Sequence, residues 1–322
     1  MSDIIFKLKG VTKYFPVTGG ILGRKIADIK AVDDVTFSIQ EGENLGLVGE
    51  SGCGKTTLGR CILDLIPLTG GKIFYYGKNI PELSSEDYKQ FRRDTAMIFQ
   101  DPFLSLHPRM TIGETIGEPY EIHGVSKGKE KEKLVMQWLQ RVGLNPYHVY
   151  RYPHQFSGGQ KQRIGIARAM ALNPKFIVAD EPVASLDVSV RASIINLMKK
   201  LQNEFKITYL FVSHDIAVVR QTCNRVIVMY LGKIAETSKV PELFNNPLHP
   251  YTEALLSSVP IPDPTIKRER IILEGDVPTP LNPPTGCRFH PRCPKRMPIC
   301  SKTEPEKIEI SKDHSVSCHL FI

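Results

Sequence analysis

A glycine-containing stretch between a predicted strand and a predicted helix constrains the fold of this chain most. In "ENLGLVGESGCGKTTLGR" an apolar strand ends at Gly49, and Gly54, Lys55 and Thr56 open a helix. Glycines let the backbone turn so that successive N–H groups point inward, where they and the helix N-terminus bind phosphate oxygens. The stretch therefore predicts a phosphate-binding loop in an α/β fold, with Lys55 on the β- and γ-phosphates and the Thr56 hydroxyl on Mg²⁺.

Two further predicted strands end in polar side chains. "PKFIVADEP" ends in Asp180 and Glu181, and adjacent carboxylates at the end of a buried strand are costly unless they are paired or bind metal. We expect Asp180 to hold Mg²⁺ and Glu181 to polarise the attacking water, although solvated acids in a turn are the plainer alternative. "ITYLFVSHD" ends in His214, which could equally be a structural histidine. Open α/β sheets bind ligands at the carboxyl ends of their strands, which favours one shared site.

A second possible anion cradle lies in "QFSGGQKQRIGIARAMAL". Ser157, Gly158 and Gly159 open a helix whose free N–H groups could bind an anion, or could simply be capped by Ser157. A single phosphate site does not need a second cradle. As a four-residue pattern it is weak, and only its place between the phosphate loop and the Asp-Glu strand sets it apart.

Taken in order, the motifs resemble those of the ATP-binding cassette (ABC) ATPases across roughly residues 1 to 240. "GESGCGKTT" is similar to their Walker A loop, "FIVADEP" to Walker B, "SGGQ" to the family signature, "SLD" to the D-loop, "VSHD" to the switch-histidine strand and "MIFQDP" to the Q-loop. The resemblance implies an α/β P-loop cassette with a small N-terminal antiparallel β subdomain. It also implies a helical subdomain that carries the signature.

The resemblance also implies ATP and Mg²⁺ as ligands, and two cassettes packed head to tail. The signature residues would then act on the partner's nucleotide, and Phe15 rather than Tyr14 would stack on adenine. The implied catalytic residues are Glu181, His214 and Gln100. The implied Mg²⁺ ligands are Thr56, Gln100 and Asp180. The implied nucleotide contacts are Phe15, Gly49, Ser51, Gly52, Cys53, Gly54, Lys55, Thr56, Thr57, Asp180, Ser157, Gly158, Gly159, Gln160 and Asp187.

The sequence after residue 240 indicates which group of ABC ATPases the chain resembles. "NNPLHPYTEALLSSVP" and "GDVPTPLNPPTGCRFHPRCP" are similar to the C-terminal extension of oligopeptide and dipeptide importer ATPases, and "GESGCGKTTLGR" looks like their subunit lettered F. We therefore expect a cassette at 1–240 and an extension at 241–322. The implied partners are a cassette subunit lettered D in a heterodimer, two transmembrane permease subunits and an extracellular or periplasmic peptide-binding protein. Nickel and murein-peptide importers share much of the pattern, so the cargo stays open.

Four cysteines, Cys287, Cys293, Cys300 and Cys318, stand in this extension, separated by five, six and seventeen residues. A reducing cytosol disfavours disulfides, and structural zinc sites usually begin with ligands two to four residues apart. A 4Fe–4S cluster also takes four thiolates and tolerates varied spacing. Iron–sulfur, zinc and unliganded thiols stay open from spacing alone; the resemblance adds that some members of the family carry a 4Fe–4S cluster here.

Composition excludes some classes of protein. No apolar stretch approaches the ~18 residues of a membrane-spanning helix, and the start lacks a signal-peptide pattern. With the resemblance, this predicts a peripheral protein on the cytoplasmic side of the cell (inner) membrane. The net charge is +8, but no long basic block or aromatic interleaving suggests nucleic acid as a partner. A soluble cassette ATPase acting on ribosomes or DNA is the competing class; one such protein has two cassettes in one chain and its cysteines at the N-terminus.

Overall fold

The computed structural model describes residues 3–19, 24–101, 105–259 and 271–322. The chain divides into two compact units. The first, here called the helical unit, consists mainly of residues 81–210 together with 40–42. The second, here called the loop unit, consists of residues 4–39, 43–80 and 211–322 and contains the predicted phosphate loop.

The helical unit is built on parallel strands that end at the predicted Asp-Glu pair. β6 (Thr95–Ile98) pairs in parallel with β7 (Phe176–Asp180), and β8 (Thr208–Ser213) begins in this unit, in the order β8-β7-β6. Every residue of β7 is buried, as expected of a parallel strand covered on both faces. The predicted strand "FIVAD" is therefore confirmed.

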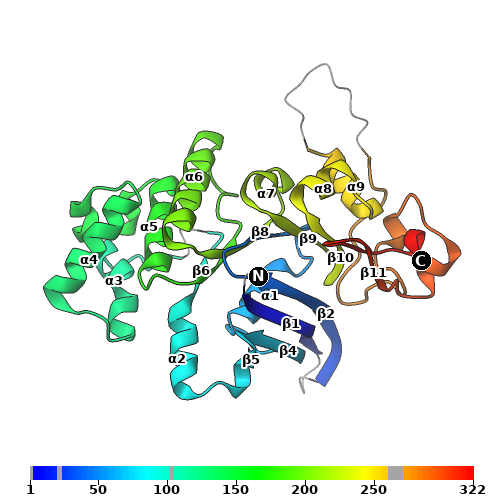
Figure 1. Ribbon diagram of the computed structural model, residues 1–322, viewed down its shortest axis with the longest axis horizontal. Helices are drawn as coiled ribbons and strands as arrows, with labels where there is room; N and C mark the ends of the chain where they lie inside the picture. The colour runs from blue at the N-terminus through cyan, green and yellow to red at the C-terminus, as the bar shows by residue number, and fades with distance from the viewer. Residues whose placement is uncertain (1–2, 20–23, 102–104, 260–270) are drawn as a thin grey trace. The chain divides into compact units, whose positions relative to one another are not determined.

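Helices make up most of the rest of this unit: α2 (Ser85–Asp94), α3 (Ile112–Ile122), α4 (Gly128–Arg141), α5 (Gly158–Met170) and α6 (Val188–Phe205). α4 buries an apolar stripe formed by Val135, Trp138 and Leu139. Its Trp138 ring is buried and packs on the Phe205 ring at the end of α6, with 5.4 Å between centroids. The helix that the signature residues open, α5, belongs to the same unit as α2, α3, α4 and α6 (Figure 1). The unit also contains β6 and β7, so a separate helical subdomain that carries the signature stays a prediction.

The loop unit contains an antiparallel sheet in the order β2-β1-β4-β5. Its strands are β1 (Ile4–Gly19), β2 (Arg24–Gln40), β4 (Gly70–Tyr75) and β5 (Lys78–Asn79). β1 and β4 pair from Phe6↔Tyr75 to Thr12↔Gly70. The predicted N-terminal antiparallel subdomain is present.

A second sheet of the loop unit carries the phosphate loop, in the order β11-β12-β10-β9-β3-β8. Its remaining strands are β3 (Asn44–Val48), β9 (Arg225–Tyr230), β10 (Lys233–Lys239), β11 (Lys307–Ser311) and β12 (His314–Ser317). β3 pairs in parallel with β9, whereas β10 pairs antiparallel with both β9 and β12. The C-terminal extension thus supplies β11 and β12, the strands at one edge of the sheet that also contains β3, the strand leading into the phosphate loop. The predicted boundary after residue 240 stays a prediction, because the compact units do not divide the chain there.

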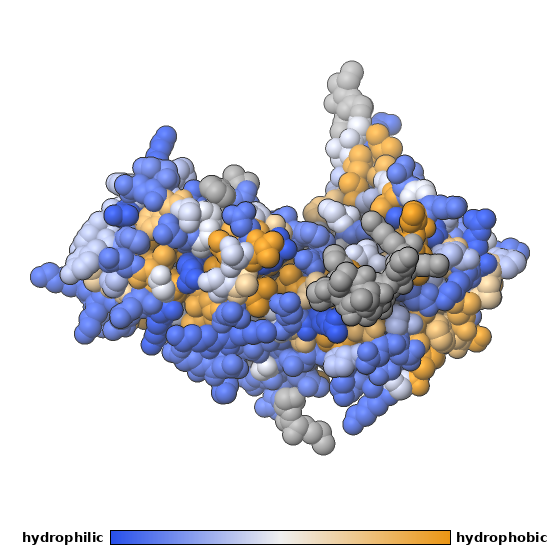
Figure 2. Space-filling model, turned by 90° about the horizontal axis from the view of Figure 1, so that it is seen from above, coloured by the Kyte–Doolittle hydropathy of each residue, from blue (hydrophilic) through white to orange (hydrophobic). Residues whose placement is uncertain are grey.

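Short helices complete the loop unit: α1 (Lys55–Ile62), α7 (Ile216–Thr222), α8 (Val240–Asn245) and α9 (Pro250–Ser257). Single 3-10 turns lie at Ile80–Glu82, Pro146–Tyr150, Pro153–Gln155, His290–Arg292, Pro298–Ser301 and His319–Phe321. In the part of the chain that the structure describes, no helix has the length and apolarity needed to cross a membrane. Figure 2 shows a face on which hydrophilic residues predominate and hydrophobic ones form separate patches.

Candidate functional site

The phosphate loop lies between β3 and α1, as the sequence predicts. Gly54 has φ 101°, and a Cβ added to it would lie 1.9 Å from the Ala31 carbonyl oxygen, so only glycine fits there. The buried Lys55 side chain folds back over the loop, where its Nζ donates to the carbonyl oxygens of Gly49 (2.8 Å) and Glu50 (2.9 Å). The lysine is thus held at the start of α1, where a phosphate would gain both its charge and the helix N-terminus.

Of the other predicted loop residues, Ser51 and Gly52 are exposed, Thr56 and Thr57 are partly exposed, and Cys53 is buried. The loop also has contacts that the sequence did not indicate. The Glu50 N–H donates to the Tyr251 hydroxyl at 2.8 Å, and the Glu50 carboxylate accepts from Arg292 at 2.8 Å. Nothing in the local pattern around any of these three residues predicts the contacts.

The predicted water-polarising carboxylate lies in the helical unit, just after β7. Asp180 ends the strand and is 2% exposed. Glu181 has φ 45°, a left-handed conformation that costs a non-glycine residue about 1–2 kcal/mol. Strained backbone of this kind gathers at functional sites, where surrounding contacts maintain it. The Gln100 amide donates to the Glu181 carboxylate at 2.9 Å, so two of the predicted catalytic side chains are in direct contact.

The signature residues form the N-terminus of α5. Ser157 is the N-cap: its hydroxyl accepts from the Gln160 N–H at 3.4 Å, while the Gln160 side chain accepts from the Ser157 N–H at 3.0 Å. This reciprocal capping box fixes the chain entering the helix. Gly158 is the first helical residue, and a Cβ on Gly159 would lie 2.4 Å from the Val190 side chain of α6. Asp187 of the D-loop is the residue that precedes α6.

The predicted catalytic His214 and the predicted adenine-stacking Phe15 lie in the loop unit. His214 is exposed directly after β8. The Phe15 ring is 37% exposed, and the Lys13 ammonium lies 4.9 Å from its centroid. The neighbouring Tyr14 hydroxyl instead donates to the Asp33 carboxylate; burial, then this hydrogen bond, raises the pKa of Tyr14 to about 12. Tyr14 is thus occupied by a protein contact, whereas Phe15 presents its ring to solvent.

The four tail cysteines all lie in the loop unit. Burial raises the pKa of the Cys287 thiol to about 11, and the nearby thiols of Cys300, Cys318 and Cys293 raise it as well. Each sulfur accepts a backbone N–H: Cys287 from Phe289, Cys293 from Lys295, Cys300 from Met297 and Cys318 from Leu320. All seven cysteines are free thiols. Within the described ranges, no three His, Cys, Asp or Glu side chains are grouped so that they could hold a metal ion.

Comparison of the sequence with known protein families identifies two matching regions. Residues 32–184 match the sequence profile described as "ABC transporter", and residues 235–300 match "Oligopeptide/dipeptide transporter, C-terminal region". The chain is 53% identical to the oligopeptide transport ATP-binding protein AppF of Bacillus subtilis (strain 168), over 99% of this chain and 98% of that protein.

Solved structures of cassettes are similar as well. The dimeric post-hydrolysis structure of the ATP-binding cassette MJ0796 bound to ADP and Pi is 33% identical, with a TM-score of 0.64, over 73% of this chain and 98% of that chain. The structure of cbiO1 from Clostridium perfringens, part of the ABC transporter complex cbiONQ, is 26% identical with a TM-score of 0.63, over 76% of this chain and 92% of that chain.

Fold and motifs together define an ABC transporter ATPase. The chain belongs to the family of ATP-binding subunits of oligopeptide/dipeptide ABC transporters.

Proposed function

We propose that this subunit hydrolyses ATP to power the import of peptides across the cytoplasmic membrane, on whose inner face it lies as a peripheral protein. The observation that carries the proposal is the match along nearly the whole chain to a protein named for oligopeptide transport, with the importer-type C-terminal region at residues 235–300. Nickel and murein peptides are the alternative cargoes. The names of the relatives favour peptides.

Each nucleotide-contacting residue has a distinct task in this proposal. Lys55 and the loop N–H groups bind phosphate oxygens, and Phe15 stacks on adenine. Asp180, together with Thr56 and Gln100, would hold Mg²⁺, which supplies charge neutralisation on the phosphates. The chemistry of the donor set fits, because Mg²⁺ is usually bound through one or two carboxylates, with phosphates and waters completing the shell, and Asp180 is a nearly buried carboxylate at a strand end.

Glu181 orients and polarises the attacking water, and Gln100 sets the position of its carboxylate through their 2.9 Å hydrogen bond. His214, which follows β8, contacts the γ-phosphate. Asp187 lies at the start of α6, beside the second cassette. These roles follow the family motif residue by residue, and the direct Gln100–Glu181 contact supports them.

The signature supports a second cassette as partner. Ser157, Gly158, Gly159 and Gln160 offer a helix N-terminus to an anion, and the similar cassette MJ0796 is a dimer in its solved structure. We propose a heterodimer with a cassette subunit lettered D, bound to two permease subunits that receive peptide from an external binding protein. Exposed apolar side chains on the helical unit offer a surface for a permease: Ile122, Val125, Tyr147, Tyr150 and Tyr152.

The test is peptide uptake into vesicles that hold the whole transporter. Glu181→Gln should keep ATP affinity while ATP hydrolysis and peptide uptake fall together by at least 100-fold, since the carboxylate positions the water. Glu204→Gln is the matched control, because it makes the same change on an exposed glutamate of α6. Hydrolysis that persists in Glu181→Gln would remove that residue from the role, and nickel uptake without peptide uptake would overturn the cargo.

We further propose that Cys287, Cys293, Cys300 and Cys318 hold a 4Fe–4S cluster that fastens the tail. Two observations support the proposal: the other thiols are near enough to affect the pKa of Cys287 and Cys293, and each sulfur accepts a backbone N–H, which favours the thiolate. Burial opposes ionisation and raises the pKa of Cys287, Cys293 and Cys318, so a bound cation would be needed to hold the thiolates. Zinc, which the same four thiolates could bind, is the alternative.

Metal content tests this assignment without reference to activity. Anaerobically purified protein should contain about four iron and four sulfide per chain, and Cys287→Ser should lose both, whereas Cys61→Ser, which changes a buried thiol on α1, should keep them. Stoichiometric zinc would make the tail a zinc site. Neither metal would withdraw the assignment and leave the ATPase unaffected.

A further inference from the structure

We propose that the tail segment 287–293, "CRFHPRC", holds the phosphate loop in its nucleotide-binding conformation, with Arg292 as a positioning residue that acts through Glu50. The inference rests on the proposed role of the loop in binding nucleotide. It adds to that role a set of residues more than two hundred positions away in the sequence.

Glu50 is held at three atoms. Its N–H donates to the Tyr251 hydroxyl at 2.8 Å, its carboxylate accepts from Arg292 Nη1 at 2.8 Å, and its carbonyl oxygen accepts from Lys55 Nζ at 2.9 Å. The Arg292 and Glu50 side chains are 9% and 25% exposed, so their ion pair is largely shielded from water. Glu50, two residues after β3, is therefore tied to the C-terminal extension, and the phosphate-binding Lys55 is tied to it through Glu50.

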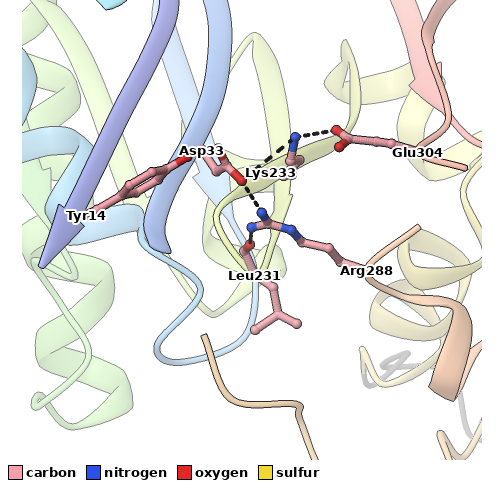
Figure 3. Close-up of polar contacts among 6 residues, drawn as sticks. All are labelled: Tyr14, Asp33, Leu231, Lys233, Arg288 and Glu304. Carbon is pink, nitrogen blue, oxygen red and sulfur yellow. Dashed lines mark hydrogen bonds and ion pairs between the residues drawn. The ribbon is translucent and has the colours of Figure 1, made fainter. Parts of the chain in front are cut away.

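The other arginine of the segment, Arg288, binds residues outside the loop (Figure 3). Arg288 donates to the Asp33 carboxylate and to the Leu231 carbonyl oxygen. The next residue, Gly232, donates its N–H to the carbonyl oxygen of Cys53 in the loop at 2.9 Å and accepts from the Asp33 N–H at 2.9 Å. Arg288 thus fixes the turn that the loop rests on.

The same network continues on both sides of Asp33 in Figure 3. Asp33 also accepts from the Tyr14 hydroxyl and lies 4.0 Å from the Lys233 ammonium, which in turn pairs with Glu304 of the tail. Burial opposes ionisation of Asp33, but the Tyr14 hydrogen bond and the Arg288 and Lys233 charges together lower its pKa. The carboxylate is therefore ionised when it binds Arg288.

An aromatic anchor fixes the segment between its two arginines. Phe289 is buried, and its ring packs on Tyr230, Tyr251 and His249 at centroid distances of 5.2, 5.4 and 5.6 Å. Tyr251 is the residue whose hydroxyl binds the Glu50 N–H. Displacement of the segment would therefore disturb both contacts to Glu50 at once.

The physical effect is preorganisation. A loop with glycines at positive φ is ordered only by its contacts, and ordering it on binding would cost conformational entropy. The ion pair removes part of that cost before nucleotide arrives. Once phosphate is bound, it orders the loop itself, so loss of the pair should raise the Kd and KM for MgATP much more than it lowers kcat.

The experiment is a double-mutant cycle on the full chain, with MgATP and MgADP affinity, single-turnover hydrolysis and the Tm without nucleotide as readouts. Arg292→Gln and Glu50→Gln should each weaken nucleotide binding about tenfold, as expected for a shielded charge-assisted pair. The double variant should be no weaker than either single one, because both remove the same interaction. Arg292→Lys should recover part of the affinity.

Lys295→Gln is the matched control. It removes a tail cation whose partner is Glu253 of α9, at 2.8 Å, so nucleotide affinity should stay at the wild-type value. Lys55→Ala tests the loop itself: retained nucleotide affinity would overturn the proposed function and this inference with it. Lost affinity in Lys55→Ala with unchanged Kd in Arg292→Gln, or with additive effects in the double variant, would overturn this inference alone.

Discussion

The buried His249 of the "HPYT" stretch allows a quantitative prediction of how the free energy of unfolding depends on pH. It is the N-cap of α9, is 3% exposed, and its Nδ1 accepts from the Tyr251 N–H at 3.0 Å. That nitrogen must stay unprotonated to accept. Burial lowers the pKa of His249 from 6.5 to about 4.

The sign follows from which state binds the proton. Between about pH 6.5 and pH 4 the unfolded chain protonates this histidine and the native chain does not, so stability falls as the pH falls through that window. Above about pH 7 the effect vanishes, because His249 is neutral in both states. The full difference corresponds to about 3 kcal/mol, of which about 2 kcal/mol is lost by pH 5.

The test compares wild type with His249→Asn in urea unfolding at about pH 7.5 and pH 5. An asparagine oxygen can accept from the Tyr251 N–H but does not titrate, so the variant should lose about 2 kcal/mol less than wild type between these pH values. His154→Asn, at an exposed histidine, should follow wild type. Equal pH dependence in wild type and His249→Asn, or a His249 ring that titrates near 6.5 by NMR, would refute the reasoning.

Two further predictions concern the nucleotide loop and the adenine contact. Gly54→Ala should abolish nucleotide binding and lower the Tm, because the new Cβ would lie 1.9 Å from the Ala31 oxygen; Gly52→Ala, also at positive φ but with nothing within 4 Å, should cost only about 1–2 kcal/mol in urea unfolding. Phe15→Ala should raise the ATP Kd about tenfold in a titration, as loss of base stacking does, and Tyr14→Phe should leave it unchanged. An unchanged Kd in Phe15→Ala together with a raised Kd in Tyr14→Ala would make Tyr14 the stacking residue.

The parts of the site set by short-range chemistry could be predicted from the sequence. The phosphate loop, the strand that ends in Asp180 and the cap at Ser157 each depend on a few adjacent residues, whose glycines, apolar run or hydroxyl determine the local backbone. The structure has all three at the predicted positions. Their roles in catalysis came from the resemblance and not from these local patterns.

Contacts between distant segments could not be predicted. Arg292 meets Glu50 across 242 residues, and Arg288 meets Asp33 across 255. The tail sequence shows only prolines, cysteines and scattered charges, and no period or spacing identifies which arginine faces which carboxylate. The short strands β11 and β12 could not be predicted for the same reason. β12 forms because it pairs with the distant strand β10, and β11 forms because it pairs with β12.

The two arginines that contact the phosphate-loop region are neighbours in sequence of two of the tail cysteines. Arg288 follows Cys287 directly, and Arg292 directly precedes Cys293. A group bound by these thiols that moves the intervening backbone must therefore change nucleotide affinity, and by reciprocity nucleotide must change the affinity for that group by the same factor. Glu50→Gln breaks this route without touching the tail. If the thiols bind a cluster as proposed, Glu50→Gln should weaken the dependence of cluster binding on nucleotide and leave cluster binding itself intact, and the part that survives would pass through Arg288, which binds Asp33 and the Leu231 carbonyl oxygen.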